Sequence, residues 1–204
     1  MSLFDGFRKK KSTTVAPSVA TTANASKDED ERFYFENPIE FAIYCKLYAS
    51  GRNITWISAD AYLKEYQKAY QLFEQRQFSK AIEILEECLK LNPIGISARF
   101  EICEANLQMH NLSAAKNALL EMKDYLVDNQ SIAKFYRRLG FVETESGNYK
   151  TAAACYLYSK EFENHPSIAQ ELMYIASKGG DSVLISNPAQ ILMKANYPIL
   201  SSVE

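Results

Sequence analysis

One residue pattern recurs along this 204-residue chain and constrains its fold more than any other feature. The pattern is bulky, small, bulky and then a fourth apolar or small residue, at steps of three, four and three: Phe78, Ala81, Leu85, Cys88; Leu112, Ala115, Leu119, Met122; Tyr149, Ala152, Tyr156, Ser159. The second copy follows the first by 34 residues, and the third follows the second by 37. A small residue lies upstream of each copy at the same offset, namely Ala69, Cys103 and Gly140. Self-similarity with this period is typical of stacked helical repeats.

Each copy predicts two helices joined by a tight turn. The turns are expected at residues 75–77, 110–112 and 146–148, and the small residues allow the two helices to approach closely. The steps of three and four place the apolar residues on one helix face. The sequence therefore predicts an all-α fold, an α-solenoid of antiparallel helix pairs, with no sheet.

The pattern resembles the tetratricopeptide repeat, whose signature is W-x2-L-G-x2-Y, then A-x3-F, then P. The third copy supplies Tyr136-Arg-Arg-Leu139-Gly140 followed by Ala152-x3-Tyr156, and the first supplies Ala81-x3-Leu85 and the terminal Leu91-Asn92-Pro93. The resemblance covers about residues 60–166 and implies three repeats in a superhelix that binds protein segments.

Composition and the repeat limits together predict four segments. They are a flexible tail at 1–32, a capping helix and loop at 33–57, three repeats at 58–166, and a capping helix with a docking segment at 167–204. The tail is rich in Ser, Thr and Ala, which cannot bury enough apolar surface to offset the entropy of ordering. Its first residues, Leu3, Phe4 and Phe7 beside the basic run 8–11, give weak contact with an anionic membrane surface as an alternative to a solubilising role.

Helix signals flank the repeats on both sides. Asn37, followed by a proline and then Glu40, predicts a helix start, and Gly51 predicts its end. A further helix is expected to begin after Ser58. At the other end, residues 167–178 predict either a capping helix or the first helix of a fourth repeat. Residues 187–194 predict a short helix that docks onto the last repeat together with Tyr197, Ile199 and Leu200.

Charge and cysteine spacing exclude several classes of protein. The net charge is −2, and residues 58–178 hold 14 Lys or Arg against 16 Asp or Glu, so nucleic acid is not an expected partner. No apolar run reaches the ~18 residues of a membrane span. The four cysteines lie far apart without a C-x-x-C pair, which favours reduced core thiols over a zinc site or disulfides. With no signal-peptide pattern, a cytoplasmic location is expected.

Residues typical of catalysis are missing, so we expect neither enzyme activity nor a cofactor or metal. The chain has no phosphate-binding loop, dinucleotide-binding motif, H-E-x-x-H or G-x-S-x-G. Its two histidines, His110 and His165, are expected in solvated loops. The acidic pairs at 86–87 and at Glu143 and Glu145 are expected to be surface charge.

The best functional prediction is a groove on the concave side, which the first helix of each repeat lines in a helix-pair solenoid. Ten positions project there, and we call them the predicted groove: Tyr66, Tyr70, Phe73, Phe100, Glu104, Leu107, Lys134, Arg137, Arg138 and Phe141. It is aromatic at one end and cationic at the other. This pattern predicts a non-enzymatic adaptor for a protein or peptide segment that combines apolar or aromatic residues with a carboxylate.

Several alternatives stay open at this point. One subclass of the family grips chaperone carboxyl termini with a Lys, Asn, Asn, Lys, Arg clamp; Lys134 and Arg138 match the last two positions, whereas Tyr66, Tyr70 and Glu101 occupy the others. The aromatic end could instead be covered by the helix of residues 38–50, and the arginines neutralised by neighbours such as Glu101, Glu104 and Glu145. Two other functions are compatible with the sequence: a dedicated chaperone for a secreted or assembly-prone client, and a self-assembling element that forms homo-oligomers.

Overall fold

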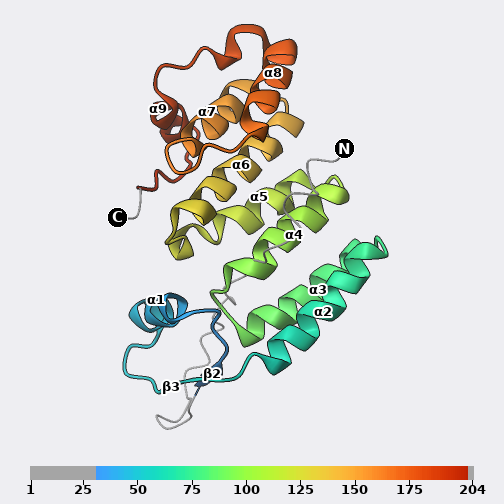
Figure 1. Cartoon of the computed structure of the whole chain (residues 1–204), viewed down its shortest axis with the longest axis vertical. Helices are drawn as coiled ribbons and strands as arrows, with labels where there is room; N and C mark the ends of the chain where they lie inside the picture. Colours follow the sequence, from blue (N-terminus) through green and yellow to red (C-terminus); the bar gives the residue numbers. More distant parts are fainter. Residues whose placement is uncertain (1–30, 202–204) are drawn as a thin grey trace. The chain divides into compact units, whose positions relative to one another are not determined.

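The computed structural model describes residues 31–201, and these fold into helices joined by short connections with one small sheet near the N-terminal end (Figure 1). The described residues form two compact units, 31–125 and 126–201. The predicted tail segment 1–30, including Leu3, Phe4 and Phe7 and the basic run that follows, lies outside the described residues. Within 31–201, no helix has both the length and the apolar character needed to cross a membrane.

The first unit begins with a parallel two-stranded sheet, which corrects the prediction of no sheet. Strand β2 (Glu31–Phe33) pairs with β3 (Ile54–Trp56), with Arg32 opposite Thr55. Two residues assigned to the flexible tail, Glu31 and Arg32, therefore belong to this strand. Each strand is three residues long, too short for period-two alternation to reveal it in the sequence.

Helix α1 (Pro38–Tyr48) lies between the two strands in the sequence. It starts as its N-capping residue predicts, but its C-cap is Ala49 rather than Gly51. The Asn37 side chain accepts hydrogen bonds from the backbone N–H groups of Ile39 and Glu40, each at 2.9 Å. Gly51, with φ of 76°, turns the chain after the helix. The predicted helix is confirmed, with its last turn ending at Tyr48.

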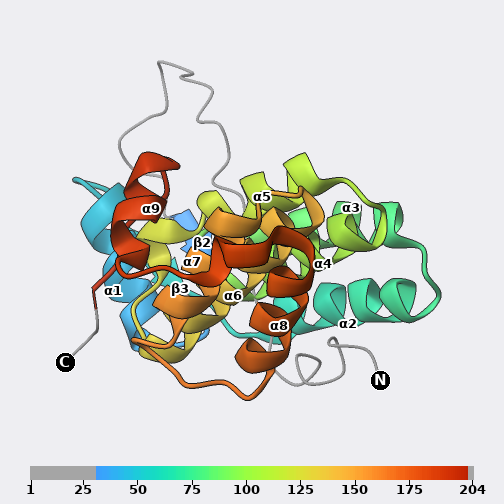
Figure 2. The ribbon, with the colours of Figure 1, turned by 90° about the horizontal axis from the view of Figure 1, so that it is seen from above.

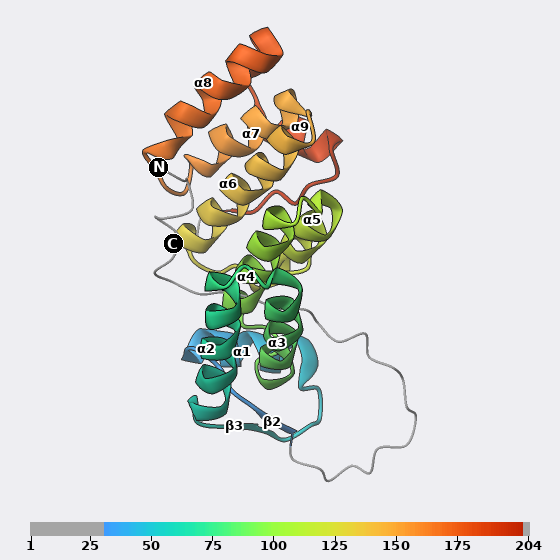
Figure 3. The same cartoon turned by 90° about the vertical axis from the view of Figure 1, so that its right-hand side faces the viewer.

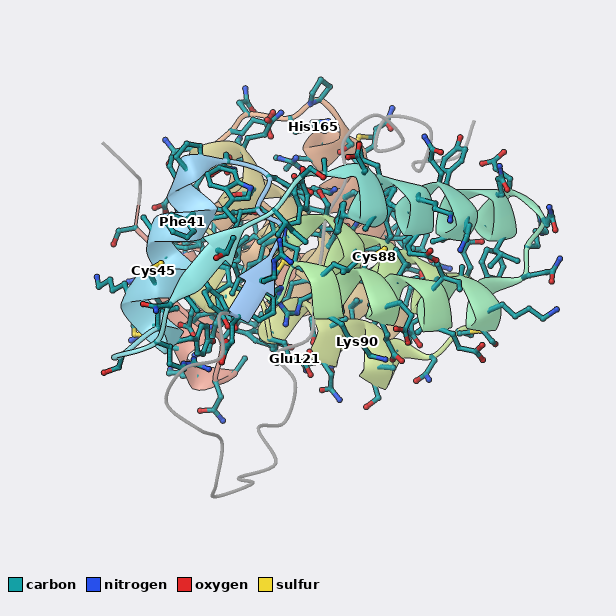
Figure 4. All side chains as sticks on the ribbon, turned by 90° about the horizontal axis from the view of Figure 1, so that it is seen from below. Phe41, Cys45, Cys88, Lys90, Glu121 and His165 are labelled. Atoms are coloured by element: carbon teal, nitrogen blue, oxygen red, sulfur yellow. The ribbon has the colours of Figure 1, made fainter. Side chains whose placement is uncertain are left out.

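An aromatic cluster holds this N-terminal part together. Phe35 is fully buried, and its ring centroid lies 5.4 Å from those of Phe41 and Tyr44 and 5.9 Å from that of Trp56. Trp56 in turn stacks on Phe41 at 5.7 Å. Figure 4 labels Phe41 and Cys45 on α1. Aromatic pairs of this geometry stabilise a fold beyond the area they bury.

The rest of the first unit consists of two helix pairs. They are α2 (Asp60–Glu74) with α3 (Phe78–Leu91) and α4 (Ile96–Gln108) with α5 (Leu112–Leu120), followed by the 3₁₀ helix η2 (Lys123–Tyr125). Within each pair the helices pack along one another, as α2 and α3 do in Figure 3, and α3 also packs on α4.

The second unit contains a third pair and two further helices. It comprises α6 (Asn129–Glu145), α7 (Tyr149–Ser159), α8 (Ser167–Gly179), the 3₁₀ helix η3 (Gly180–Val183) and α9 (Pro188–Lys194). Helix α7 packs on α6, and both α8 and α9 pack on α7 (Figure 2). The predicted helices at 167–178 and 187–194 are confirmed. Because α9 returns to α7, we interpret α8 as a capping helix.

The register of the three repeats is confirmed by burial and by the turns. Ala81, Ala115 and Ala152 are each fully buried, as the close approach of paired helices requires. The turn residues Arg76, His110 and Gly147 have φ values of 57°, 56° and 75°. They are spaced by 34 and 37 residues, as the repeats are. The chain thus leaves the first helix of every pair through the same left-handed position, and the fold is all-α apart from the small sheet.

The four cysteines are free thiols, and the prediction that they lie in the core is confirmed for three of them. Cys88, Cys103 and Cys155 are buried, whereas Cys45 on α1 is partly exposed. The three buried thiols lie on packed helices, where a cysteine acts as a small apolar residue.

Candidate functional site

The ten residues of the predicted groove lie on the first helices of the three pairs. Six of them are on α2 and α4, in the unit 31–125, and four are on α6, in the unit 126–201. The two sets are therefore described separately below.

On α2, Tyr66 is occupied by contacts inside its own unit. It is 8% exposed, its ring stacks on that of Tyr62 at 5.9 Å, and its hydroxyl is hydrogen-bonded to the Glu101 carboxylate. Burial, and then the charge of Glu101, raise the Tyr66 pKa well above its ordinary value. Tyr66 and Glu101 thus tie α2 to α4, and they hold two of the three positions at which a carboxylate clamp would need other side chains.

Tyr70 is the exposed residue among the three predicted aromatic positions on α2. Its side chain is 48% exposed, so the helix that contains residues 38–48 does not cover it. Phe73, one turn further on, is partly buried and makes an edge contact with Phe78 of α3 at 5.1 Å. Of the three predicted aromatic positions on α2, Tyr70 is the one that presents most of its surface to a ligand.

The α4 positions are more buried than an open groove lining. Phe100, Glu104 and Leu107 are 3%, 6% and 6% exposed. The Glu104 carboxylate accepts a 2.9 Å hydrogen bond from the side-chain amide of Gln108. These side chains therefore contribute mainly to packing in this structure.

On α6, Arg137 is held by an acid that sequence reasoning missed. Its Nη1 donates to Glu163 Oε2 at 2.7 Å, and the Arg137 side chain is 6% exposed. Burial lowers the Arg137 pKa, while the hydrogen bond and the charge of Glu163 oppose that shift. The proposed neutralising neighbours of the arginines were Glu101, Glu104 and Glu145, so for Arg137 the partner is corrected to Glu163, in the loop after α7.

Near Arg138 lies a second set of residues that sequence reasoning missed. Tyr156 of α7 is hydrogen-bonded to the Glu171 carboxylate of α8, and its pKa is raised by burial and by that acid while the nearby Arg138 charge opposes the shift. Burial also raises the Glu171 pKa. Arg138 is 7% exposed, whereas Lys134 and Phe141 are partly exposed. A cation, a phenol and a carboxylate therefore meet where α6, α7 and α8 pack.

Two other sequence expectations need correction. Glu143 was expected to be surface charge, but it is 2% exposed, and its Oε2 accepts a 2.8 Å bond from Asn148 Nδ2. His165 was expected to be solvated; it is partly buried, and its Nδ1 lies 2.8 Å from Ser167 Oγ. Burial lowers the His165 pKa, with a further lowering from the Arg137 charge. His110 is exposed, as expected.

Among residues 31–201, no three His, Cys, Asp or Glu side chains come together in a way that could hold a metal ion. Tyrosine and arginine, which both occur among the predicted groove residues, are residue types that often anchor protein segments at interfaces.

Comparison with known proteins agrees with the repeat pattern. A family model described as "Tetratricopeptide repeat" matches residues 72–139. A solved structure titled "First TPR of Spaghetti (RPAP3) bound to HSP90 peptide SRMEEVD" is similar, with a TM-score of 0.52 and 19% sequence identity; the alignment covers 59% of this chain and 94% of that one. No curated protein gives a significant sequence match.

Proposed function

Residues 72–139 match the tetratricopeptide repeat family, and from this premise we propose that the chain is a non-enzymatic adaptor that binds a segment of a partner protein. The residues that would contact this segment are those of the predicted groove on the first helices of the repeats. Members of this family are generally interaction modules, and the similar solved domain carries a peptide according to its title. A cytoplasmic location stays a prediction.

The observation that carries the proposal is the exposure of Tyr70. A tyrosine that is 48% exposed on a first helix offers a large, rigid apolar surface and a hydroxyl at low entropic cost. Lys134, partly exposed on α6, supplies positive charge. These two residues favour a ligand that carries an apolar or aromatic side chain and a carboxylate.

The same contacts argue against a full carboxylate clamp for chaperone tails. Such a clamp needs cationic or amide donors where this chain has Tyr66, Tyr70 and Glu101. The hydrogen bond between Tyr66 and Glu101 fills two of these positions with groups of neutral and negative character. An acidic tail such as SRMEEVD, which the similar domain binds according to its title, would meet the Glu101 carboxylate. We therefore expect a partner with fewer acidic residues at the α2 and α4 end.

A pull-down with mass spectrometry tests the proposal. The tagged parent chain is compared with Tyr70→Ala and Lys134→Glu, and with Lys90→Glu as the control, because Lys90 is exposed on α3, outside the predicted groove. We expect both groove variants to lose the same partner, which the Lys90→Glu chain keeps. Retention of every partner by both groove variants would show that this face is not the binding site.

A further inference from the structure

The C-terminal segment that follows α9 is held as a ligand would be. At the end of α9, Asn196 adopts φ of 59°, and the backbone N–H of Tyr197 donates to the carbonyl of Leu192 at 2.9 Å. This left-handed turn is one that asparagine tolerates. It directs residues 197–200 onto the pair α6 and α7.

Two tyrosine hydroxyls contact the backbone of this segment. Tyr136 Oη donates to the carbonyl of Pro198 at 2.8 Å and accepts from the N–H of Leu200 at 3.0 Å. Tyr158 Oη donates to the carbonyl of Leu200 at 2.8 Å. A phenol can both donate and accept a hydrogen bond, so Tyr136 satisfies one backbone donor and one backbone acceptor of the same segment.

The two tyrosines are themselves rigidly held. Tyr136 is fully buried and Tyr158 is 5% exposed, and their rings meet edge to face at 4.8 Å. Phe162 stacks on Tyr136 at 5.9 Å and makes an edge contact with Tyr158 at 5.5 Å. Hydroxyls fixed in this way lose little freedom when a peptide binds them, which favours binding. We call Tyr136, Tyr158, Phe162 and Glu143 the tyrosine platform.

One side chain of the segment is recognised as well. Tyr197 is 6% exposed, and its hydroxyl donates a short hydrogen bond to Glu143 Oε1. Burial, followed by this bond, raises the Tyr197 pKa. A buried carboxylate needs donors, and the segment supplies one from Tyr197. By contrast, Ile199 is 39% exposed and contributes less.

The tyrosine platform is a different surface from the predicted groove. Tyr136 and Glu143 are seven residues apart and share one face of α6, while Lys134 and Arg138 lie about 160° around the helix axis from Tyr136. An inference about the platform therefore does not depend on the adaptor function proposed above.

We propose that the tyrosine platform is a peptide-binding site that the chain's own residues 197–200 fill, and that an extended segment of a partner protein occupies it by displacing them. The contacts define the chemistry of that segment. It carries a tyrosine for Glu143 and, three residues later, an N–H and a carbonyl for the two platform hydroxyls. The backbone contacts tolerate different side chains between these positions.

Residues 197–200, which we call the resident segment, are covalently attached to the chain, and this attachment determines the affinity that a competing peptide needs. A tethered segment acts at an effective concentration in the millimolar range, so the intact chain binds a competing peptide weakly. Release of the resident segment opens the site. The arrangement thus works as an internal block on the tyrosine platform.

Fluorescence anisotropy with a labelled peptide of residues 195–201 tests this proposal in full-length chains. The first variant, Tyr197→Ala with Leu200→Pro, disables the resident segment by removing the hydroxyl for Glu143 and the N–H for Tyr136. Ile199→Ala is the matched control. We expect the first variant to bind the peptide at least tenfold more tightly than the parent and the control do. Adding Tyr136→Phe and Tyr158→Phe to it should abolish that gain.

Equal peptide affinity of the first variant and the parent would overturn the proposal, as would a gain that survives removal of both platform hydroxyls. If the variant is poorly folded by circular dichroism, hydrogen exchange in the parent chain decides. The Leu200 N–H should be protected in the free chain and should exchange faster as unlabelled peptide is added, while a scrambled peptide has no effect. Unchanged protection at millimolar peptide would also overturn the proposal.

Discussion

Gly140 of α6 lies directly against the ring of Tyr156 of α7. A Cβ built at Gly140 would be 2.9 Å from Tyr156 Cε2, nearer than carbon atoms approach in folded proteins. Tyr156 is itself 2% exposed and packs in a cluster with Ala152, Ile168 and Ile175. The absence of a side chain at Gly140 is thus what allows α6 and α7 to pair at this distance.

Gly140→Ala should therefore destabilise the protein. Alanine favours a helix over glycine by about 1 kcal/mol, but overpacking of this kind costs about 1–3 kcal/mol. We expect a net loss of about 1 kcal/mol in the free energy of unfolding, measured in urea. In a Tyr156→Leu background the ring is gone, so the same substitution should cost less. An equal cost in both backgrounds would show that the ring contact is not responsible.

The left-handed turn residues give a second prediction with a built-in comparison. His110 and Gly147 occupy the same turn position in successive repeats, with φ of 56° and 75°. The left-handed conformation costs a non-glycine residue about 1–2 kcal/mol. Glycine avoids this cost, but its larger conformational entropy in the unfolded chain offsets part of the gain. We expect His110→Gly to raise the free energy of unfolding by about 0.5–1 kcal/mol.

Gly147→Ala should lower it by about 1 kcal/mol, although nothing lies within 4 Å of the added Cβ. Both changes can be measured by urea titration of the parent and the variants at the same pH. Changes of the same sign in the two variants would rule out backbone conformation as the cause.

Sequence periodicity predicted the repeats because their packing is local. A helix pair needs small residues where its helices cross, and Ala81, Ala115 and Ala152 carry this requirement in the sequence itself. The turn positions are recoverable for the same reason, since the repeat spacing fixes them even where arginine or histidine replaces glycine.

The candidate binding residues were harder to predict because their partners are distant in sequence. Glu143 reads as a surface acid until Tyr197, 54 residues later, is placed beside it. Arg137 finds Glu163 in the loop after α7, 26 residues away, rather than an acid on a neighbouring first helix. Periodicity assigns a residue to a helix face, but it does not reveal which loop or terminal segment covers that face.

A buried acid in the N-terminal part should make stability depend on pH. Glu40 of α1 is 6% exposed, and its Oε2 accepts hydrogen bonds from the Glu36 N–H at 2.6 Å and from Asn92 Nδ2 at 3.1 Å. Burial, with a smaller contribution from the Glu36 charge, raises the Glu40 pKa from 4.5 to about 7. The folded state therefore favours the protonated acid.

The resulting stabilisation is complete below pH 4.5 and is lost as the pH rises through 7. A shift of this size corresponds to about 3 kcal/mol. Urea titrations between pH 4.5 and 8 should show that Glu40→Gln removes this part of the pH dependence, because glutamine does not titrate. The same slope in parent and variant would assign the pH dependence to other groups.

Arg99 supports a prediction about the cost of a buried charge. It is fully buried on α4, its guanidinium lies 5.1 Å over the Tyr125 ring, and its Nε is 3.8 Å from Glu121, beyond hydrogen-bond distance. The equivalent position of the third repeat holds an uncharged aromatic residue, Tyr136. Replacing a poorly compensated buried ion with an apolar side chain of similar length is often stabilising.

We expect Arg99→Met to raise the free energy of unfolding by about 1–3 kcal/mol. Arg99→Ala should lower it instead, because it leaves a cavity. Thermal and urea unfolding of both variants provide the measurement. A similar loss in the two variants would mean that the ring contact and the Glu121 charge together outweigh the cost of burying the guanidinium.

The last prediction separates the apolar and electrostatic parts of the proposed partner binding. Once the partner segment is identified by pull-down, its dissociation constant can be measured at low and high salt. Tyr70→Ala should weaken binding by about 1–3 kcal/mol at every salt concentration, because an aromatic anchor acts by burial of apolar surface. Lys134→Glu should weaken binding chiefly at low salt, since salt screens pairs of exposed charges. Lys134 is the better probe than Arg137 or Arg138, which are 6% and 7% exposed and whose replacement would also disturb packing. If the Lys134→Glu loss is the same at all salt concentrations, this lysine does not meet a carboxylate of the partner across solvent.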